Sequence, residues 1–341
     1  MKIVQDAHST YKNNKVIDMK CPAFLLALSF SLVVAGAQAD EPRRPECIAP
    51  SSPGGGFDIT CKLLQGGLNE QKLLNSPMRV TYMPGGLGAV AYNVIAGQKK
   101  ADPGLVTVFS SGSLMNLAQG KFGRFDESAV KWLAALGVDY GLVAVRADSR
   151  FKTLDDLAVA LKQNPGAVPM GAGGTVGSHG WMRAALLARE IGVDARALRY
   201  VPFEGGATHY TALMGGHIEV VFGATSEVAG QIEAGTLRVL AVLADERLPG
   251  KLNDIPTAKE QGYDVSWPVI RGFYMGPEVS DEAFAWWRGA FDRLFASAKF
   301  SQQVERRDLY PLAMAGGELD AYVKRQVAEY RQLAKEFGLA E

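Results

Sequence analysis

Three glycine-rich loops contain the residue types most able to do chemistry in this sequence. The first reads PSSPGGGFD over residues 50–58, the second PGGLG over 84–88 and the third GAGGTVGS over 171–178. Glycine has no Cβ, so backbone N–H groups in such turns can approach a ligand closely. Each loop precedes a stretch with helical periodicity, and a helix N-terminus carries partial positive charge. Together the loops predict a cleft that binds an anion.

Nucleotide and catalytic motifs fit these loops poorly. The glycines at 171, 173, 174 and 177 do not give the G-x-G-x-x-G spacing of a dinucleotide loop, and no Gly-Lys-Ser/Thr follows any loop, which excludes a P-loop. A nucleophile elbow has glycine two residues to either side of its serine, whereas residue 176, two before Ser178, is valine. Ser178 is better explained as a helix N-cap that also donates to a ligand.

Cysteines and histidines are too scattered for a zinc site. After residue 39 the chain has Cys47 and Cys61, and its histidines at 179, 209 and 217 belong to unrelated segments. A disulfide between the two cysteines remains open, because one lies on an expected strand and the other on an expected helix. We therefore expect no metal ion and no cofactor.

The N-terminus has the pattern of a secretory signal. Residues 22–39 read PAFLLALSFSLVVAGAQA, an apolar run that follows Lys20 and ends in small residues. The run is short for a membrane span of about 20 residues, although a retained anchor is the alternative interpretation. We expect residues 1–39 to hold a signal peptide with an upstream extension, and the mature protein to be periplasmic.

The composition is that of an ordinary globular protein. Of 341 residues 48% are hydrophobic, and 36 basic side chains balance 36 acidic ones. Such a chain is not disordered, and without a positive field it is not expected to bind nucleic acid. The length suggests two domains.

Short apolar runs alternate with helical patterns, which predicts α/β domains, each a mainly parallel sheet flanked by helices. We expect strands at residues 46–49, 78–82, 106–109, 142–145, 168–171, 198–201, 219–222, 237–243 and 272–275. We expect helices at residues 57–68, 154–163, 178–191, 207–214, 227–234, 257–261, 281–298 and 318–337, and one beginning near residue 89.

A series of motifs in a fixed order supports a more specific interpretation. These are PGGGFD (53–58), PGGLG (84–88), SSGS (110–113) with Asn116, NPG (164–166), GGTVGS (173–178), YVPFEGG (200–206), GGH (215–217) and DIPTA (254–258). With them, the sequence resembles the solute-binding proteins of the tripartite tricarboxylate transporters, the Bug family, over essentially the whole mature chain. CIAP (47–50) and WPVIRGFY (267–274) are most similar to the tricarboxylate-binding subgroup.

The resemblance implies a two-domain periplasmic binding protein of the type II, Venus-flytrap kind. It would close around an organic tri- or dicarboxylate and deliver it to a membrane permease. The expected ligand is an acid similar to citrate. The ligand-binding residues carried over by position are Gly55, Gly56, Phe57, Gly86, Leu87, Ser111, Thr175, Gly177, Ser178, Phe203, Gly205 and Ala224. Hinge strands are expected near residues 140–145 and 269–274, which gives one domain from 40–143 plus 271–341 and another from 144–270.

Arg271 departs from the commonest family pattern and lies in an otherwise apolar segment. Its guanidinium could neutralise a third ligand carboxylate, since helix N-termini supply only partial charge. The alternative is a structural arginine that pairs with an acid such as Asp58 or Glu204, or one that reaches solvent.

Binding without catalysis is the expected function, because the loops offer backbone groups and hydroxyls rather than a poised acid, base or nucleophile. Two alternatives remain. One is a secreted α/β enzyme, a dehydrogenase or hydrolase, and the other is a binding protein whose loaded form docks on a sensor kinase.

Overall fold

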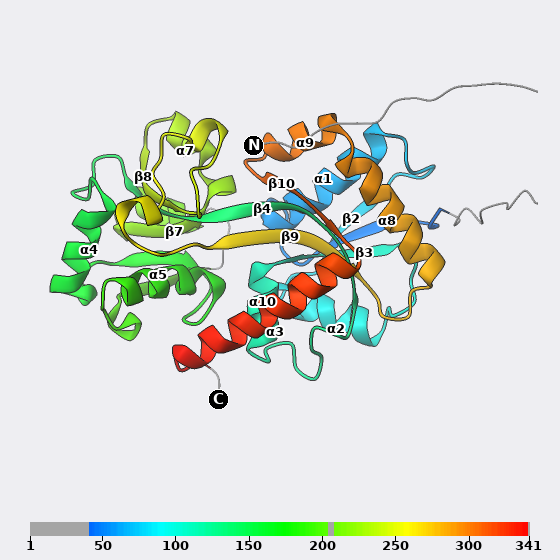
Figure 1. Ribbon diagram of the computed structural model, residues 1–341, viewed down its shortest axis with the longest axis horizontal. Coiled ribbons are helices and arrows are strands. Elements are labelled where there is room, and N and C mark those ends of the chain that lie inside the picture. Colours follow the sequence, from blue (N-terminus) through cyan, green and yellow to red (C-terminus); the bar gives the residue numbers. More distant parts are fainter. Residues whose placement is uncertain (1–40, 204–207, 340–341) are drawn as a thin grey trace, which may run out of the picture. The chain divides into compact units, whose positions relative to one another are not determined.

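The computed structural model describes residues 41–203 and 208–339 (Figure 1). The expected signal peptide at residues 1–39 and the expected ligand residue Gly205 therefore lie outside the described residues. The strands are β1 (Glu46–Ala49), β2 (Arg79–Tyr82), β3 (Leu105–Ser110), β4 (Lys131–Arg146), β5 (Met170–Gly173), β6 (Tyr200–Phe203), β7 (Val220–Ala224), β8 (Leu237–Leu243), β9 (Pro268–Met275) and β10 (Tyr310–Ala315).

Helices connect most of these strands. The α-helices are α1 (Gly56–Glu70), α2 (Ala89–Gly97), α3 (Ser111–Ala118), α4 (Leu154–Gln163), α5 (His179–Glu190), α6 (Thr208–Met214), α7 (Ala229–Glu233), α8 (Asp281–Phe295), α9 (Ala298–Glu305) and α10 (Gly317–Glu336). Short 3-10 turns include η1 (Gly86–Gly88), η4 (Thr225–Glu227) and η6 (Lys259–Gln261). The alternation of strands and helices confirms the α/β class.

Strand β1 lies between β2 and β3, and both pairings are parallel. The carboxyl ends of these strands therefore meet at one edge, where the chain enters α1, η1 and α3. A disulfide joins Cys47 on β1 to Cys61 on α1, with a Cα separation of 5.8 Å. This pairing, which the sequence left open, closes the first glycine loop covalently.

Strands β4 and β9 run antiparallel side by side and connect two groups of strands (Figure 1). Residues 131–140 of β4 pair with β9, whereas from Gly141 onward β4 pairs with β7 and β8. Strand β9 also pairs with β3, and β10 adds to the first part of β4. The pairing partners of β4 thus change between Tyr140 and Gly141, in the middle of one continuous strand.

The second group of strands repeats the parallel arrangement. Strand β5 lies between β6 and β7 in parallel register, and β7 pairs antiparallel with β4. Their carboxyl ends lead into the third glycine loop and into η4. Both groups are therefore mixed rather than mainly parallel, because β4, β8, β9 and β10 run against their neighbours.

The C-terminal part returns to the first group of strands. Helices α8 and α9 contribute Trp287, Phe291 and Phe300 to the core that holds the disulfide. Helix α10 lies along α3 and buries Val323, Val327 and Tyr330 (Figure 1). Within the described residues, no helix is both long and apolar enough to cross a membrane.

Four details of the fold differ from the sequence analysis: one expected helix is absent, one is shorter than expected, and two elements were not anticipated. Residues 257–261 form no α-helix, because Thr257 bridges to Val242 and only the η6 turn follows. Strand β10 and helix α3 were not anticipated. The expected helix over 281–298 ends at Phe295, and α9 begins separately after the N-cap Ser297, which accepts from Phe300 N–H.

Candidate functional site

Helix α1 begins at Gly56, at the end of the first glycine loop. Asp58 fixes this loop: its carboxylate accepts from Gly54 N–H (2.7 Å), Tyr82 Oη (2.9 Å) and Lys62 Nζ (2.7 Å). Burial opposes its ionisation, but these hydrogen bonds outweigh burial and hold the pKa of Asp58 below its usual value. The Phe57 side chain is buried in the core beside the disulfide, so only its backbone can face a ligand.

Arg271 on β9 reaches the N-terminus of α1. A Cβ added at Gly56 would lie only 2.1 Å from Arg271 Nη1, so the guanidinium occupies the space that this glycine leaves open. Its Nη2 donates to Asp139 Oδ2 (2.9 Å), and Nε is buried without a hydrogen-bond partner in the described part of the chain. Two expected site residues, Gly56 and Arg271, are thus in contact.

Asp139, just before the change of pairing in β4, is the acid that pairs with Arg271. Its carboxyl side chain is 0% exposed, and the Arg271 side chain is 10% exposed. The sequence had offered Asp58 or Glu204 as a structural partner; Asp58 instead binds Lys62, and Glu204 lies outside the described residues. The structure therefore gives Arg271 a buried ion pair with a carboxylate that sequence reasoning missed.

Helix α3 begins beside Arg271, because Ser110, its N-cap, is the strand partner of Arg271 in the β3–β9 register. Ser111 is fully buried, and its hydroxyl accepts from Ile270 N–H (2.9 Å) and lies 3.3 Å from Pro268 O. The expected ligand residue Ser111 thus uses its hydroxyl to join α3 to β9.

The second glycine loop packs on α3. The Gly86 carbonyl accepts from Asn116 Nδ2 (3.1 Å), and the Leu87 carbonyl accepts from Ser113 Oγ (3.0 Å). Leu87 is one of few non-glycine residues with positive φ among those described, at 52°, and its side chain is exposed. The loop therefore directs its carbonyls inward to α3.

The third loop ends in a helix cap. Ser178 is 3% exposed; its Oγ accepts from Trp181 N–H (3.3 Å) and donates to Gly173 O (3.2 Å), and its own N–H donates to Thr175 O (2.9 Å). The expected cap is present. Gly177 O accepts from Gln119 Nε2 (2.7 Å) at the end of α3, so this loop touches the first group of elements.

The N-terminus of α5 meets that of α3. A Cβ added at Gly112 would lie 3.7 Å from the Cβ of His179. His179 Nε2 accepts from Trp267 Nε1 (2.7 Å), and burial, with the nearby guanidinium groups of Arg183 and Arg271, holds the pKa of His179 well below its usual value. His179 is therefore neutral at pH 7.

Arg183, one turn further along α5, is a second buried arginine. Its Nη1 donates to the carbonyls of Phe222 (3.1 Å) and Gly223, at the carboxyl end of β7. The next residue, Ala224, is buried, and its N–H donates to Glu227 Oε2 (3.2 Å). Burial lowers the pKa of Arg183, while the Glu227 and Asp139 carboxylates act in the opposite direction.

Six of the expected site residues fall into two groups. Gly55, Gly56, Arg271 and Ser111 lie around the starts of α1 and α3, and Gly177 and Ser178 lie at the start of α5. Thr175 is exposed, and Phe203 is half-buried with its ring against Gly171. The starts of α1, α3 and α5 are linked through Arg271, Ser110, Gly112 and His179, which concentrates positive potential at one place.

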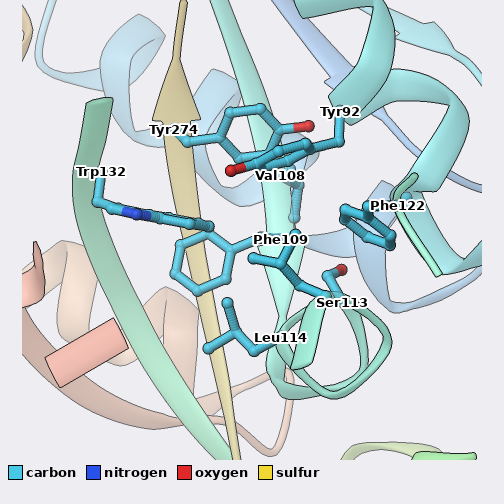
Figure 2. A pocket seen from close by; sticks show the side chains of 10 residues that line it. Tyr92, Val108, Phe109, Ser113, Leu114, Phe122, Trp132 and Tyr274 are labelled. Atoms are coloured by element: carbon cyan, nitrogen blue, oxygen red, sulfur yellow. The ribbon is translucent and has the colours of Figure 1, made fainter. Parts of the chain in front are cut away.

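An aromatic cluster lies apart from these helix ends. Figure 2 shows Tyr92 and Tyr274 facing each other, with Phe109, Phe122 and Trp132 around them. The gap between these rings has no room for a water-sized sphere. We assign the cluster to the core. Among the described residues, no group of three or more His, Cys, Asp or Glu side chains could hold a metal ion.

Comparison with known proteins gives consistent matches. A family model described as the tripartite tricarboxylate transporter family receptor, TctC, matches residues 71–339. The UPF0065 protein in the gbd 5' region of Cupriavidus necator is 25% identical over 327 residues, which cover 92% of this chain and 94% of that protein.

Solved structures agree on the fold. A TctC solute-binding protein from Polaromonas, without ligand, has a TM-score of 0.67 and 26% identity and covers 87% of this chain and 100% of its own. MatC from Rhodopseudomonas palustris with bound malate has a TM-score of 0.74 and 20% identity, and the match covers 85% of this chain and 98% of MatC. An R. palustris protein with adipate has a TM-score of 0.79 and 19% identity, and the match covers 88% of this chain and 99% of that protein. The latter two likenesses indicate the two-domain periplasmic binding protein fold alone.

Proposed function

Because this chain belongs to the tripartite tricarboxylate transporter receptor family, we propose that it captures an organic di- or tricarboxylate and presents it to a membrane permease. The family consists of periplasmic solute-binding proteins, which are transport receptors and not enzymes. Citrate is one candidate ligand. The carboxylate would bind where the helix N-termini meet.

One observation carries this proposal: α1, α3 and α5 begin around the Arg271 guanidinium. Arg271 Nη1 lies against Gly56 at the start of α1, and Arg271 pairs in register with Ser110 at the start of α3. His179, the first residue of α5, lies beside Gly112, where an added Cβ would be 3.7 Å from His179 Cβ. Unpaired backbone N–H groups at helix starts and a guanidinium are the groups that proteins use to bind carboxylates.

Two structural neighbours support a carboxylate ligand. The two from R. palustris were solved with malate and with adipate, and both ligands are dicarboxylates. The ligand-binding residues that we propose are those carried over from the family pattern, with Phe57 acting through its backbone and Ser178 acting as the cap that positions the start of α5. Gly205 is kept on the same basis, although it lies outside the described residues.

We propose that ligand binding closes two domains, 40–143 plus 271–341 and 144–270. In support, β4 changes its pairing partners between Tyr140 and Gly141, and Gly141 N–H donates to Trp267 O (3.0 Å) just before β9 begins. Two adjacent strand segments would then act as the hinge. A ligand that contacts both domains favours the closed state by those added contacts.

The test is calorimetric titration of protein that has been unfolded without reductant, freed of bound ligand and refolded. Malate, succinate, adipate and citrate are titrated, with acetate and glycerol as monoanionic and neutral controls. We expect at least one di- or tricarboxylate to bind, and a ligand at 100 times its Kd to add about 2.7 kcal/mol to the free energy of unfolding. Failure of every carboxylate to bind would refute the proposal.

Delivery to a permease is tested separately. Deletion of the gene for this protein should abolish uptake of the bound acid, and a plasmid-borne copy should restore it. If the deletion leaves uptake intact but abolishes the cell's transcriptional response to that acid, a sensor kinase is the partner instead.

A further inference from the structure

We infer that Asp139 sets the ligand charge that the site accepts, and that its pairing with Arg271 makes a dicarboxylate bind more tightly than a tricarboxylate. The inference rests on the proposed function, because it concerns the same anion site. Asp139 was not among the residues expected from the sequence. It is the only carboxylate that forms an ion pair with Arg271 in the described part of the chain.

The Asp139 carboxylate is held by five hydrogen bonds. Oδ1 accepts from Tyr140 N–H (2.9 Å), Thr225 Oγ1 (2.5 Å) and Ser226 N–H (3.2 Å). Oδ2 accepts from Ser226 Oγ (2.5 Å) and Arg271 Nη2 (2.9 Å). A fully buried carboxylate with this many hydrogen bonds is fixed in place.

This pairing offsets the arginine charge that a ligand would experience. One edge of the guanidinium bonds Asp139, while Nη1 lies against Gly56 at the start of α1. A ligand carboxylate at that helix start is attracted by Arg271 and repelled by Asp139 just behind it. The repulsion grows with every negative charge that the ligand carries. Arg271 therefore supplies geometry and hydrogen-bond donors more than net charge.

The other charges around the site also favour a ligand with two negative charges. Arg183 is the other buried arginine among the residues that the structure describes, and the Glu227 carboxylate attracts it. The charge of Arg183 is offset by Glu227, and the charge of Arg271 is offset by Asp139. The remaining positive potential therefore comes from the starts of α1, α3 and α5. Each helix N-terminus is equivalent to about half a unit charge, about 1.5 in total. That total is closer to two ligand carboxylates than to three.

The experiment measures the Kd of citrate divided by the Kd of the best-bound dicarboxylate, by calorimetry at pH 8, where the ligands are fully ionised. We expect this ratio to exceed one in the wild type. Asp139→Asn removes the negative charge with little change of shape and should lower the ratio at least tenfold. Arg271→Ala should raise it at least tenfold.

The matched control is Glu127→Gln. Glu127 also pairs with an arginine, Arg331, and its side chain is only 15% exposed; the side-chain hydrogen bonds given for these two residues join them to each other and not to the helix starts described above. This variant changes the net charge by the same amount and should keep the ratio within about twofold. An equal fall in Asp139→Asn and Glu127→Gln would show a general charge effect and overturn the inference.

A double variant covers the case in which Asp139→Asn does not fold. Asp139→Asn with Arg271→Ala leaves no buried charge unpaired, so it should fold better than either single change. Its ratio should return to within about threefold of the wild type. A ratio equal to that of Arg271→Ala would mean that Asp139 contributes no charge to the site. Carboxylate binding with an unchanged ratio refutes this inference alone, whereas no binding refutes the proposed function.

Discussion

At the scale of single residues, Gly56 and Arg271 depend on one another. Glycine at position 56 is needed because the guanidinium fills the space where a Cβ would be, 2.1 Å from Nη1. The sequence suggested that this glycine makes room for a ligand carboxylate. The structure adds that it makes room for the arginine that would meet that carboxylate.

Gly56→Val is therefore expected to displace Arg271 and weaken ligand binding by at least tenfold, while the protein still folds. Calorimetry measures the ligand affinity, and thermal unfolding shows whether the variant is folded. The control is Gly289→Val, because a Cβ added at Gly289 in α8 meets nothing within 4 Å. Wild-type affinity in Gly56→Val would remove the start of α1 from the site.

Ser178→Ala is expected to act mainly on stability. The Ser178 hydroxyl and N–H already bond within the third loop and the first turn of α5. Loss of an N-cap costs about 1 kcal/mol, so the melting temperature should fall while the Kd changes less than about twofold. A loss of affinity worth about 1–3 kcal/mol, with an unchanged melting temperature, would instead show that the hydroxyl binds the ligand.

Some site residues left no signal in the sequence. Asp139 follows a run of small and apolar residues on β4, and Arg183 lies in a helix where a lone arginine usually reaches solvent. Their burial depends on partners far along the chain. Asp139 pairs with Arg271, and Arg183 bonds to the end of β7. Glycine spacing predicted the loops because that signal is local.

At the scale of elements, strong periodicity predicted most helices and the apolar strands. Strand β10 was missed because its sequence, YPLAMA, has a proline and residues of low strand propensity. Only the second half of β4 was predicted, since WLAALG in the first half contains residues that favour helices. Pairing with β9 and β10 overrides that preference.

The disulfide links strand β1 to helix α1. Cys47 and Cys61 are 14 residues apart in sequence and enclose the first glycine loop. Replacing both with alanine should lower the free energy of unfolding by about 3 kcal/mol, measured by urea unfolding. We also expect weaker ligand binding, because the loop must then be ordered at binding. Unchanged stability and affinity would leave the disulfide without either role.

At the scale of the whole molecule, one hydrogen bond reports on the proposed closure. Gln119 at the end of α3 donates to Gly177 O in the third loop (2.7 Å), so it joins segments assigned to different domains. A neutral hydrogen bond is worth about 1 kcal/mol, and its loss should favour the open state.

Gln119→Ala should therefore weaken ligand affinity about fivefold and increase the radius of gyration of the ligand-free protein, measured by small-angle X-ray scattering. Gln98→Ala is the control, because Gln98 also follows the last residue of a helix, α2, but is exposed. An unchanged radius of gyration and affinity in Gln119→Ala would mean that this contact does not stabilise closure.

The place of β9 in the sheet has a consequence for biosynthesis. Strand β3 pairs with β1 on one side and with β9 on the other, and β9 also pairs with the first part of β4. In a chain that is made or exported from its N-terminus, the edges of β3 and β4 that pair with β9 stay open until residue 275 has emerged. Such edges invite pairing with other chains. Truncation before β9 should therefore produce aggregates, although all three glycine loops precede that point in the sequence.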